Sequence, residues 1–158
     1  MKMTTLCYIR EGGNVLMLYR NKKEKDENAG KWIGVGGKLE EGESPEDCLL
    51  REVREETGLT LLRRQFRGIV TFVSDEWGTE QMFLYTADGF EGKLKECEEG
   101  ELRWIPEEKI PELSLWEGDR IFLRKLFDTE EVFFLKLIYS GDRLTEVRDY
   151  EMIPPPRT

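Results

Sequence analysis

Residues 37–59 read GKLEEGESPEDCLLREVREETGL, and this stretch decides how the chain is interpreted. Its second half reads as a helix that runs up to Gly58. Three carboxylates, Glu52, Glu55 and Glu56, are then spaced i, i+3 and i+4 and project from one helical face. Like charges this close repel each other, so a divalent cation is expected among them. Oxygen ligands suit Mg²⁺ or Mn²⁺, which in enzymes usually bridge protein carboxylates and substrate phosphates. We therefore expect the substrate to be a phosphate compound.

Local signals mark both ends of this helix. Ser44 is a suitable N-cap, Pro45 suits the first helical position, and the acids that follow complement the helix dipole. Gly58 is well placed as the C′ residue in a left-handed conformation. The sequence therefore predicts a helix between these limits, whose buried side is supplied by Leu49, Leu50 and Val53.

The same residues match a known pattern without a gap. The segment resembles the Nudix hydrolase signature, G-x5-E-x7-R-E-U-x-E-E-x-G-U with U an aliphatic residue. The specified positions are filled by Gly37, Glu43, Arg51, Glu52, Val53, Glu55, Glu56, Gly58 and Leu59. The alternative is a solvated acidic helix in which Asp47 and Glu55 pair with Arg51 at i±4. That alternative explains the charges but not the placement of the glycines.

The resemblance implies roles for the acidic residues. Glu52, Glu55 and Glu56 would be the catalytic and metal-binding residues, with Glu52 as the first candidate for the general base. Glu55 and Glu56 would be the principal ligands of Mg²⁺, for which Mn²⁺ is a possible substitute. The metals would neutralise the polyphosphate and lower the pKa of a bound water.

The resemblance also implies ligands outside the helix. The glycine-rich loop would offer the Gly36 carbonyl to the metal. The acidic stretch 96–101 would supply one more ligand, for which Glu99 is the best positional match and Glu98 the runner-up. A solvated acidic loop is the competing interpretation of that stretch.

Four further signature residues are expected to have structural roles. Glu43 and Arg51 would form an ion pair that ties the loop to the helix. Gly37 would let the backbone approach a ligand closely, and Gly58 would end the helix.

The charge balance limits the possible partners. The 158 residues contain 24 Lys plus Arg against 33 Asp plus Glu, a formal net charge of −9. A broad surface for a nucleic-acid polymer or an anionic membrane is therefore not expected, and the substrate's phosphates must be bound locally. Lys38, inside the matched loop, is the favoured cation. The candidates that cluster before and within that loop are Arg20, Lys22, Lys23, Lys31 and Lys38.

The segments 29–38 and 116–119 resemble the MutT-type branch of the family. That branch hydrolyses oxidised purine nucleoside triphosphates such as 8-oxo-dGTP to the monophosphate and pyrophosphate. Trp116 would stack on the base and Asp119 would hydrogen-bond its edge. The competing interpretation is a core tryptophan followed by a first-turn helix acid.

Two departures leave the base less certain than the reaction. Ile33 stands where some purine-sanitising relatives carry a base-reading Asn, and Gly118 precedes Asp119 where some carry paired acids. Other Nudix substrates, ADP-ribose and dinucleoside polyphosphates, remain alternatives, although the Pro or Tyr typical of those enzymes is missing around residues 74–77. A non-catalytic nucleotide-binding module is a third alternative. The complete set of signature carboxylates argues against it.

The absence of histidine and the spacing of the cysteines exclude several other kinds of catalytic and metal site. The chain has no His, so a His general base, a Ser/His/Asp triad and a His-based zinc site are excluded. Its three cysteines lack C-x-x-C spacing and are expected to be reduced thiols. With no apolar signal segment and no apolar stretch long enough to span a bilayer, a cytoplasmic location is expected. The sequence does not predict the oligomeric state.

Residue periodicity predicts a mixed α and β domain over residues 1–158. The resemblance implies an α/β fold, a Nudix-type α/β/α sandwich with a mixed β-sheet between helices. The expected elements are strands over 4–10, 15–20, 68–74, 81–86, 102–105, 132–139 and 143–150, a hairpin turn over 11–14, a polar loop over 21–30, a second helix from 116 or 117 to 127, and an extended tail at 154–156.

Overall fold

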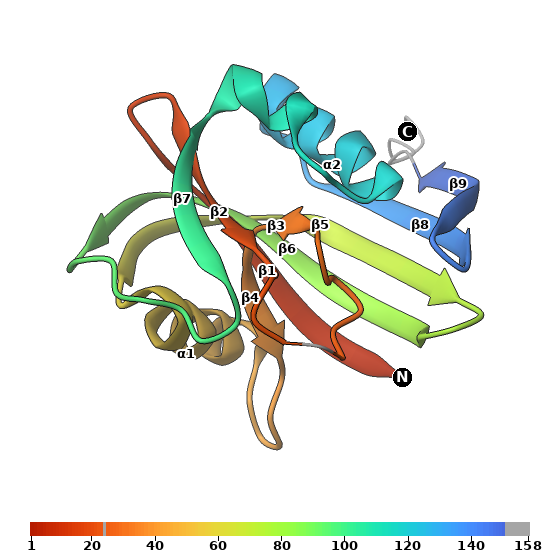
Figure 1. The fold of residues 1–158 in the computed structure, drawn as a ribbon, viewed down its shortest axis with the longest axis horizontal. Coiled ribbons are helices and arrows are strands. Elements are labelled where there is room, and N and C mark those ends of the chain that lie inside the picture. Colours follow the sequence, from red (N-terminus) through yellow and green to blue (C-terminus); the bar gives the residue numbers. More distant parts are fainter. Residues whose placement is uncertain (24, 151–158) are drawn as a thin grey trace, which may run out of the picture.

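One mixed sheet with a helix on each face forms the body of the molecule (Figure 1). The computed structural model describes residues 1–23 and 25–150, and the tail expected at 154–156 lies outside them. The elements in chain order are β1 (Lys2–Glu11), β2 (Asn14–Tyr19), β3 (Trp32–Ile33), β4 (Val35–Lys38), α1 (Pro45–Thr57), β5 (Thr60–Ser74), β6 (Gly78–Glu91), β7 (Glu101–Pro106), the 3₁₀ helix η1 (Glu107–Glu112), α2 (Glu117–Asp128), β8 (Phe133–Ser140) and β9 (Arg143–Tyr150).

Strand β1 organises the sheet. The strand order is β3-β2-β1-β6-β5-β8-β9, with β4 added on β1 and β7 added on β2. One edge of β1 runs parallel to β6, while the other is shared between β4, which pairs with residues 4–7, and β2, which pairs at residues 10–11. Strands β4 and β2 therefore diverge along the same edge of β1, and the glycine-rich segment lies where they separate.

Alternation along β1 separates the two hydrophobic layers. Leu6 and Tyr8 pack in the cluster that contains the apolar side of α2, whereas Cys7 and Ile9 pack in the cluster that contains the apolar side of α1. Successive side chains of a strand point to opposite faces, so the two helices cover opposite faces of the sheet. The expected sandwich of helices around a mixed sheet is confirmed.

Helix α1 begins and ends where its sequence predicts. The Ser44 hydroxyl accepts the Asp47 amide and the Asp47 carboxylate accepts the Ser44 amide, which completes a capping box. At the other end Gly58 adopts φ 81°, and a Cβ there would lie 2.7 Å from the Lys93 carbonyl oxygen. Only glycine fits this left-handed position.

Helix α2 has no comparable local caps. Its N-cap residue, Trp116, makes no side-chain capping hydrogen bond. Its C-terminal end is held by the fully buried Arg67 of β5, whose guanidinium donates to the carbonyls of Leu126 (3.0 Å) and Thr129 (2.7 Å). This contact spans about sixty residues of sequence and was not predicted.

All the expected strands are present, and the structure differs from the prediction in three details. Strands β5 and β6 are longer than predicted because bulges near residues 61–68 interrupt the alternation that marks a strand. Gly34 divides the segment after the polar loop into β3 and β4, which pair with different strands. The short helix η1 was not predicted. The turn at Gly12 and Gly13, with φ of 57° and 82°, is the expected hairpin between β1 and β2.

The cysteines and the helices bear on two further expectations. Cys7, Cys48 and Cys97 are buried and free, as expected for reduced thiols. Within residues 1–23 and 25–150, neither helix has the length and apolar character needed to cross a bilayer.

Candidate active site

The glycine-rich strand β4 lies directly against α1. A Cβ at Gly37 would lie 2.6 Å from Oε1 of Glu52, and a Cβ at Gly36 would collide with the carbonyl oxygen of Thr5 on β1. Side chains at these two positions would push β4 away from both neighbours. The glycines therefore allow the Glu52 carboxylate to approach the loop backbone closely.

Glu56 is the buried acid of this site. Its side chain is only 6% exposed, and its Oε1 accepts the Gly36 amide at 2.8 Å. Its Oε2 is buried and has no hydrogen-bond partner among the described residues. An unsatisfied buried carboxylate oxygen is costly, so this atom needs a proton or a cation.

Arg51 gathers the acids at the exposed side of α1. Its guanidinium donates to both oxygens of Glu43 (2.7 and 2.9 Å), which is the ion pair expected between loop and helix. It also donates to Glu52 at 2.6 Å and to Glu55 at 3.3 Å. The hydrogen bonds from Arg51 to Glu43 are the largest cause of the low pKa of Glu43, which is about 2. Arg51 also donates to the Lys38 carbonyl at 3.0 Å, which adds a second contact between helix and loop beside the Glu43 pair.

Glu99 approaches the site from the loop before β7. It accepts Arg20 at 2.5 Å and Lys23 at 3.1 Å, while Arg20 also donates to Asp26 at 2.6 Å. The neighbouring Glu98 is exposed. Glu99 is therefore the member of the acidic stretch that faces the helix acids, and Arg20 is already neutralised by two carboxylates.

The two inner acids on α1 have raised pKa values. Burial raises the pKa of Glu56 to about 8, the Gly36 amide lowers it, and the nearby charges of Glu99 and Glu52 raise it. Burial also raises the pKa of Glu52, against the lowering effect of Arg51. Both shifts are what one expects of carboxylates gathered in a poorly solvated place without a cation.

The acids do not form a closed metal site by themselves. Within residues 1–23 and 25–150, no three acidic or cysteine side chains converge as a ready ligand group. The reason is visible in the contacts: Glu52 and Glu55 turn to Arg51, and Glu99 turns to Arg20. The donor set nevertheless fits a hard divalent cation, because all donors are oxygens and Glu56 offers one that lacks a partner.

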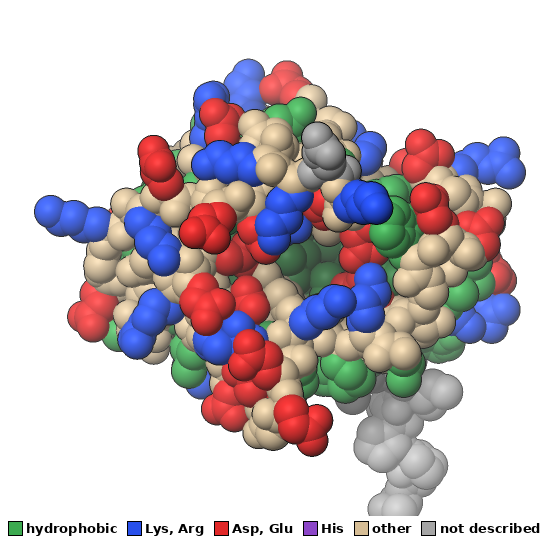
Figure 2. All heavy atoms as spheres, turned by 60° about the horizontal axis from the view of Figure 1, so that its bottom comes forward, with side chains coloured by type: hydrophobic (Ala, Val, Ile, Leu, Met, Phe, Trp, Pro, Cys, Tyr) green, Lys and Arg blue, Asp and Glu red, His purple; other side chains and the backbone are tan. Residues whose placement is uncertain are grey.

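A cavity of about 420 Å³ opens beside this acidic cluster. Figure 2 shows the hollow, with hydrophobic atoms at its floor and both acidic and basic side chains around its rim. Its size falls in the range of small-molecule sites. The predicted residues that line it are Arg20, Gly36, Gly37, Lys38, Glu52, Glu99, Trp116 and Asp119.

The other predicted residues lie outside the lining. Glu56 is buried behind Gly36, and Glu55 is 61% exposed on the outer side of Arg51. Glu43 and Arg51 tie the loop to the helix, and Gly58 ends the helix. Of the remaining cations considered, Lys22 donates to the Cys97 carbonyl, Lys23 pairs with Glu99 and Lys31 lies over the Trp116 ring.

The far end of the cavity contains Trp116 and Asp119. Trp116 is fixed by a 2.9 Å hydrogen bond from its indole nitrogen to Asn28 and by an edge contact with Tyr139 at 5.4 Å. Asp119 is 4% exposed, and its carboxylate makes no hydrogen bond within the described part of the chain. The pKa of Asp119 is raised to about 8, by burial first and by the charge of Glu80 second, against the lowering effects of Lys31 and Arg120.

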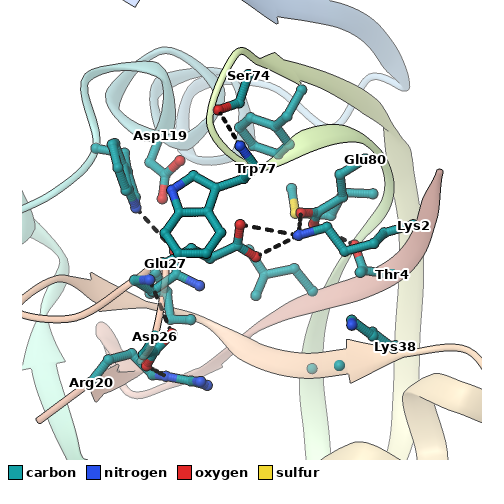
Figure 3. A pocket seen from close by; sticks show the side chains of 18 of the residues that line it. Lys2, Thr4, Arg20, Asp26, Glu27, Lys38, Ser74, Trp77, Glu80 and Asp119 are labelled. Carbon is teal, nitrogen blue, oxygen red and sulfur yellow. Dashed lines mark hydrogen bonds and ion pairs between the residues drawn. The ribbon is translucent and has the colours of Figure 1, made fainter. Parts of the chain in front are cut away.

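Several lining residues were missed from the sequence. Figure 3 shows Lys2, Glu27 and Glu80 together at one side of the cavity. Lys2 donates to both oxygens of Glu27 (2.9 and 3.0 Å) and lies 3.6 Å from Glu80, which also accepts the Thr4 hydroxyl at 2.7 Å. The parallel register that sets Lys2 opposite Glu80 brings them together. Nothing in the local sequence predicts that register.

Comparisons with known proteins agree with this geometry. The NUDIX domain family model matches residues 2–126. The chain is 34% identical over 127 residues to the uncharacterized Nudix hydrolase YvcI of Bacillus subtilis, covering 75% of each protein. It is also 34% identical over 119 residues to the oxidized purine nucleoside triphosphate hydrolase of Danio rerio, covering 75% of this chain and 74% of that one.

A solved structure has the same fold. The MutT protein from Bacillus halodurans superimposes with a TM-score of 0.85 at 27% identity, covering 94% of this chain and 97% of that chain. With the family model matching most of the chain and the signature carboxylates gathered beside a cavity, the protein is a hydrolase of pyrophosphate bonds. The chain belongs to the Nudix hydrolase family.

Proposed function

We propose that the protein hydrolyses a nucleoside triphosphate carrying an oxidised purine, such as 8-oxo-dGTP, to the nucleoside monophosphate and pyrophosphate in the presence of Mg²⁺. One observation carries the proposal. A single cavity runs from the acids Glu52 and Glu99 to the aromatic and acidic pair Trp116 and Asp119. A nucleotide has this same division, with phosphates at one end and a flat base with hydrogen-bonding edges at the other. The name of the Danio rerio relative supports the choice of substrate.

Four groups on this chain fit the role of holding Mg²⁺. They are the carboxylates of Glu52, Glu56 and Glu99 and the carbonyl of Gly36. Glu55, on the outer side of Arg51, would be a fifth group. When bound, Mg²⁺ would supply charge neutralisation of the polyphosphate and a lower pKa for a coordinated water. Glu56 would give up the proton favoured by its burial, because its partnerless Oε2 would then face a cation.

Glu52 is suited to accept the proton of the attacking water. Its carboxylate lines the cavity, and Arg51 holds Oε1 at 2.6 Å, which fixes the orientation of the group. Its pKa is raised by burial, which makes it a better base than a solvated carboxylate. Arg51 in turn is fixed by Glu43, so the ion pair between loop and helix has a positioning role in catalysis.

Lys38 is better suited than Arg20 to bind the phosphates. Lys38 lines the cavity, is exposed, and makes no ion pair within the described residues. Arg20 also lines the cavity but already contacts Asp26 and Glu99. We therefore assign Lys38 to direct phosphate contact, and Arg20 to contact only after Glu99 has turned to a metal.

The base end is suited to a purine with exposed N–H groups. Oxidation at C8 of guanine converts N7 from an acceptor into an N–H donor, and a carboxylate without a partner accepts such donors. Asp119 offers such an acceptor: its pKa is raised to about 8, so the group carries a proton near neutral pH, and its carbonyl oxygen still accepts an N–H. Trp116 offers a flat surface whose position is fixed by Asn28 and Tyr139. Ile33 offers no hydrogen bond to the base, so recognition rests mainly on Asp119.

The experiment that tests the proposal is a substrate panel. Release of pyrophosphate or phosphate would be measured from 8-oxo-dGTP, dGTP, ADP-ribose and diadenosine tetraphosphate, with Mg²⁺ and with EDTA. The highest kcat/KM is expected for 8-oxo-dGTP, with no turnover in EDTA. A higher kcat/KM for ADP-ribose or the dinucleotide would replace the proposed substrate, and binding without turnover of any compound would indicate a nucleotide-binding module.

The position of attack gives a second test. Attack of water on an inner phosphorus yields the monophosphate and pyrophosphate, so orthophosphate should not be the first product. Hydrolysis in ¹⁸O-water followed by mass spectrometry locates the attacked phosphorus. Label found only in orthophosphate derived from the γ-position would contradict the proposed reaction.

A further inference from the structure

Trp77 lies on the turn between β5 and β6, at the mouth of the cavity. The Ser74 hydroxyl accepts the amides of Glu76 (3.1 Å) and Trp77 (2.9 Å), which fixes the turn. The preceding Asp75 accepts the Gly141 amide at 2.9 Å, which ties the turn to the hairpin of β8 and β9. The position of the Trp77 backbone is therefore held by contacts on both sides.

The side chain of Trp77 has no structural role that we can identify. Trp32 packs on Tyr19 and Trp104 packs on Phe90, and both pairs have centroid distances below 6 Å. The Trp77 ring joins neither aromatic pairs nor the two hydrophobic clusters within residues 1–23 and 25–150, and its indole nitrogen makes no hydrogen bond there. It is 44% exposed, yet it lines the cavity. A large indole without a packing partner on a fixed turn is available to a ligand.

The neighbours of Trp77 in the cavity suit a flat ring with polar edges. In Figure 3 the indole extends over the cavity, between Asp119 and Glu27 in this view. The lining also contains the apolar side chains of Phe72 and Met82. A base that enters this end meets apolar and aromatic groups on its faces and the partnerless Asp119 carboxylate at an edge.

We propose that Trp77 stacks on the base of the bound nucleotide and gives the cavity a preference for purines over pyrimidines. This specificity role rests on the proposed function, because it concerns the base end of the same cavity. A two-ring purine overlaps an indole more fully than a one-ring pyrimidine. Aromatic stacking of a base on a protein side chain changes affinity by about tenfold on removal of the side chain.

The test measures binding rather than catalysis. Dissociation constants for dGMP, 8-oxo-dGMP and dCMP would be measured by calorimetry in EDTA for the wild type and for Trp77→Ala, Trp77→Phe and Glu76→Ala. Glu76→Ala is the matched control, because it lies on the same turn, is exposed and does not line the cavity. Circular dichroism and thermal melting verify that each variant is folded.

The expected result is selective. Trp77→Ala should weaken the binding of the two purine monophosphates by about tenfold and the binding of dCMP by no more than about twofold. Trp77→Phe should restore most of the lost affinity. Glu76→Ala should bind all three nucleotides as the wild type does. Equal affinities in wild type and Trp77→Ala, equal losses for all three nucleotides, or the same loss in Glu76→Ala would overturn the stacking role. A change of oligomeric state in Trp77→Ala with unchanged affinities would also overturn it and assign the ring to contact between copies.

Failure of the proposed function gives a different pattern. The protein could hydrolyse none of the triphosphates in the panel and still show the Trp77-dependent affinity for purine monophosphates. That result would contradict the proposed reaction and support the stacking role. If kcat/KM for 8-oxo-dGTP is the same in the wild type and in Trp77→Ala, the proposed reaction stands and the stacking role is contradicted. Wild type that binds none of the monophosphates would overturn the stacking role directly.

Discussion

Each of the two helices contributes one buried acid to the site, and their surroundings differ. Glu56 on α1 and Asp119 on α2 are both almost fully buried, and burial raises both pKa values to about 8. Glu56 has a backbone amide on one oxygen and lies near the charges of Glu99, Glu52 and Arg20. Asp119 accepts no hydrogen bond from the described residues and lies beside aromatic side chains at the far end of the cavity.

Burial alone therefore does not define the chemistry of a carboxylate. An acid among other acids is suited to a cation, because several oxygens can share the charge. An acid beside aromatic rings is suited to the N–H edge of a base, because one partner satisfies it. The two ends of the cavity therefore respond to different substitutions, which the following predictions use.

The largest expected effect is on turnover at the α1 end. Glu56→Gln keeps the shape of the side chain but removes a negative ligand, so kcat should fall by about 10²-fold or more with little change in melting temperature. Glu46→Gln, on the same helix but away from the cavity, is the control. Steady-state release of pyrophosphate in Mg²⁺ measures the effect. Near-normal turnover in the Glu52→Gln, Glu56→Gln double variant would rule out the proposed metal end.

The second prediction compares how the two helices are held. Arg67→Met leaves the last carbonyls of α2 without donors inside the protein, which should lower the free energy of unfolding by about 2–4 kcal/mol. Ser44→Ala removes the local cap of α1 and should cost about 1 kcal/mol. Urea unfolding measures both, with the exposed Arg63→Met as control. A smaller loss for Arg67→Met than for Ser44→Ala would reverse the comparison.

The third prediction concerns the base end. Asp119→Ala removes an acceptor for the base but leaves the acids of α1 in place. Since losing a hydrogen bond to a ligand costs about 1–3 kcal/mol, kcat/KM for 8-oxo-dGTP should fall by about one to two powers of ten. A pyrimidine triphosphate should be affected much less. A uniform loss for 8-oxo-dGTP, dGTP and a pyrimidine triphosphate would remove Asp119 from base recognition.

The fourth prediction concerns the pH dependence of stability. Because the pKa of Asp119 is about 8 in the folded protein and near 3.8 when unfolded, the folded state binds the extra proton between these values. Its contribution to stability is complete below pH 3.8 and is lost as the pH rises toward about 8, with a slope of at most about 1.4 kcal/mol per pH unit. The free energy of unfolding of wild type minus that of Asp119→Asn should therefore fall between pH 5 and 8. A difference that is flat or rises over this range would mean that Asp119 is not buried as described.

Helix α1 and the acidic end of the site could be predicted from the sequence. Its capping box, its terminal glycine and the spacing of its acids lie within one continuous segment, so short-range geometry fixes where each side chain points. The ion pair between Glu43 and Arg51 was predicted from the resemblance alone, and it joins residues eight positions apart. The first hairpin was predictable from the local sequence, since its two glycines form the turn themselves.

The rest of the site depends on contacts between segments that are distant in the sequence. The cavity is built where β1 meets β4 and β6, and a parallel register leaves no signal in either strand. The register places Lys2 beside Glu80, and the turn between β5 and β6 brings Trp77 to the cavity. The hold of Arg67 on α2 likewise depends on contacts about sixty residues apart. Such contacts form only when the whole sheet is in place, because no local conformational preference specifies them.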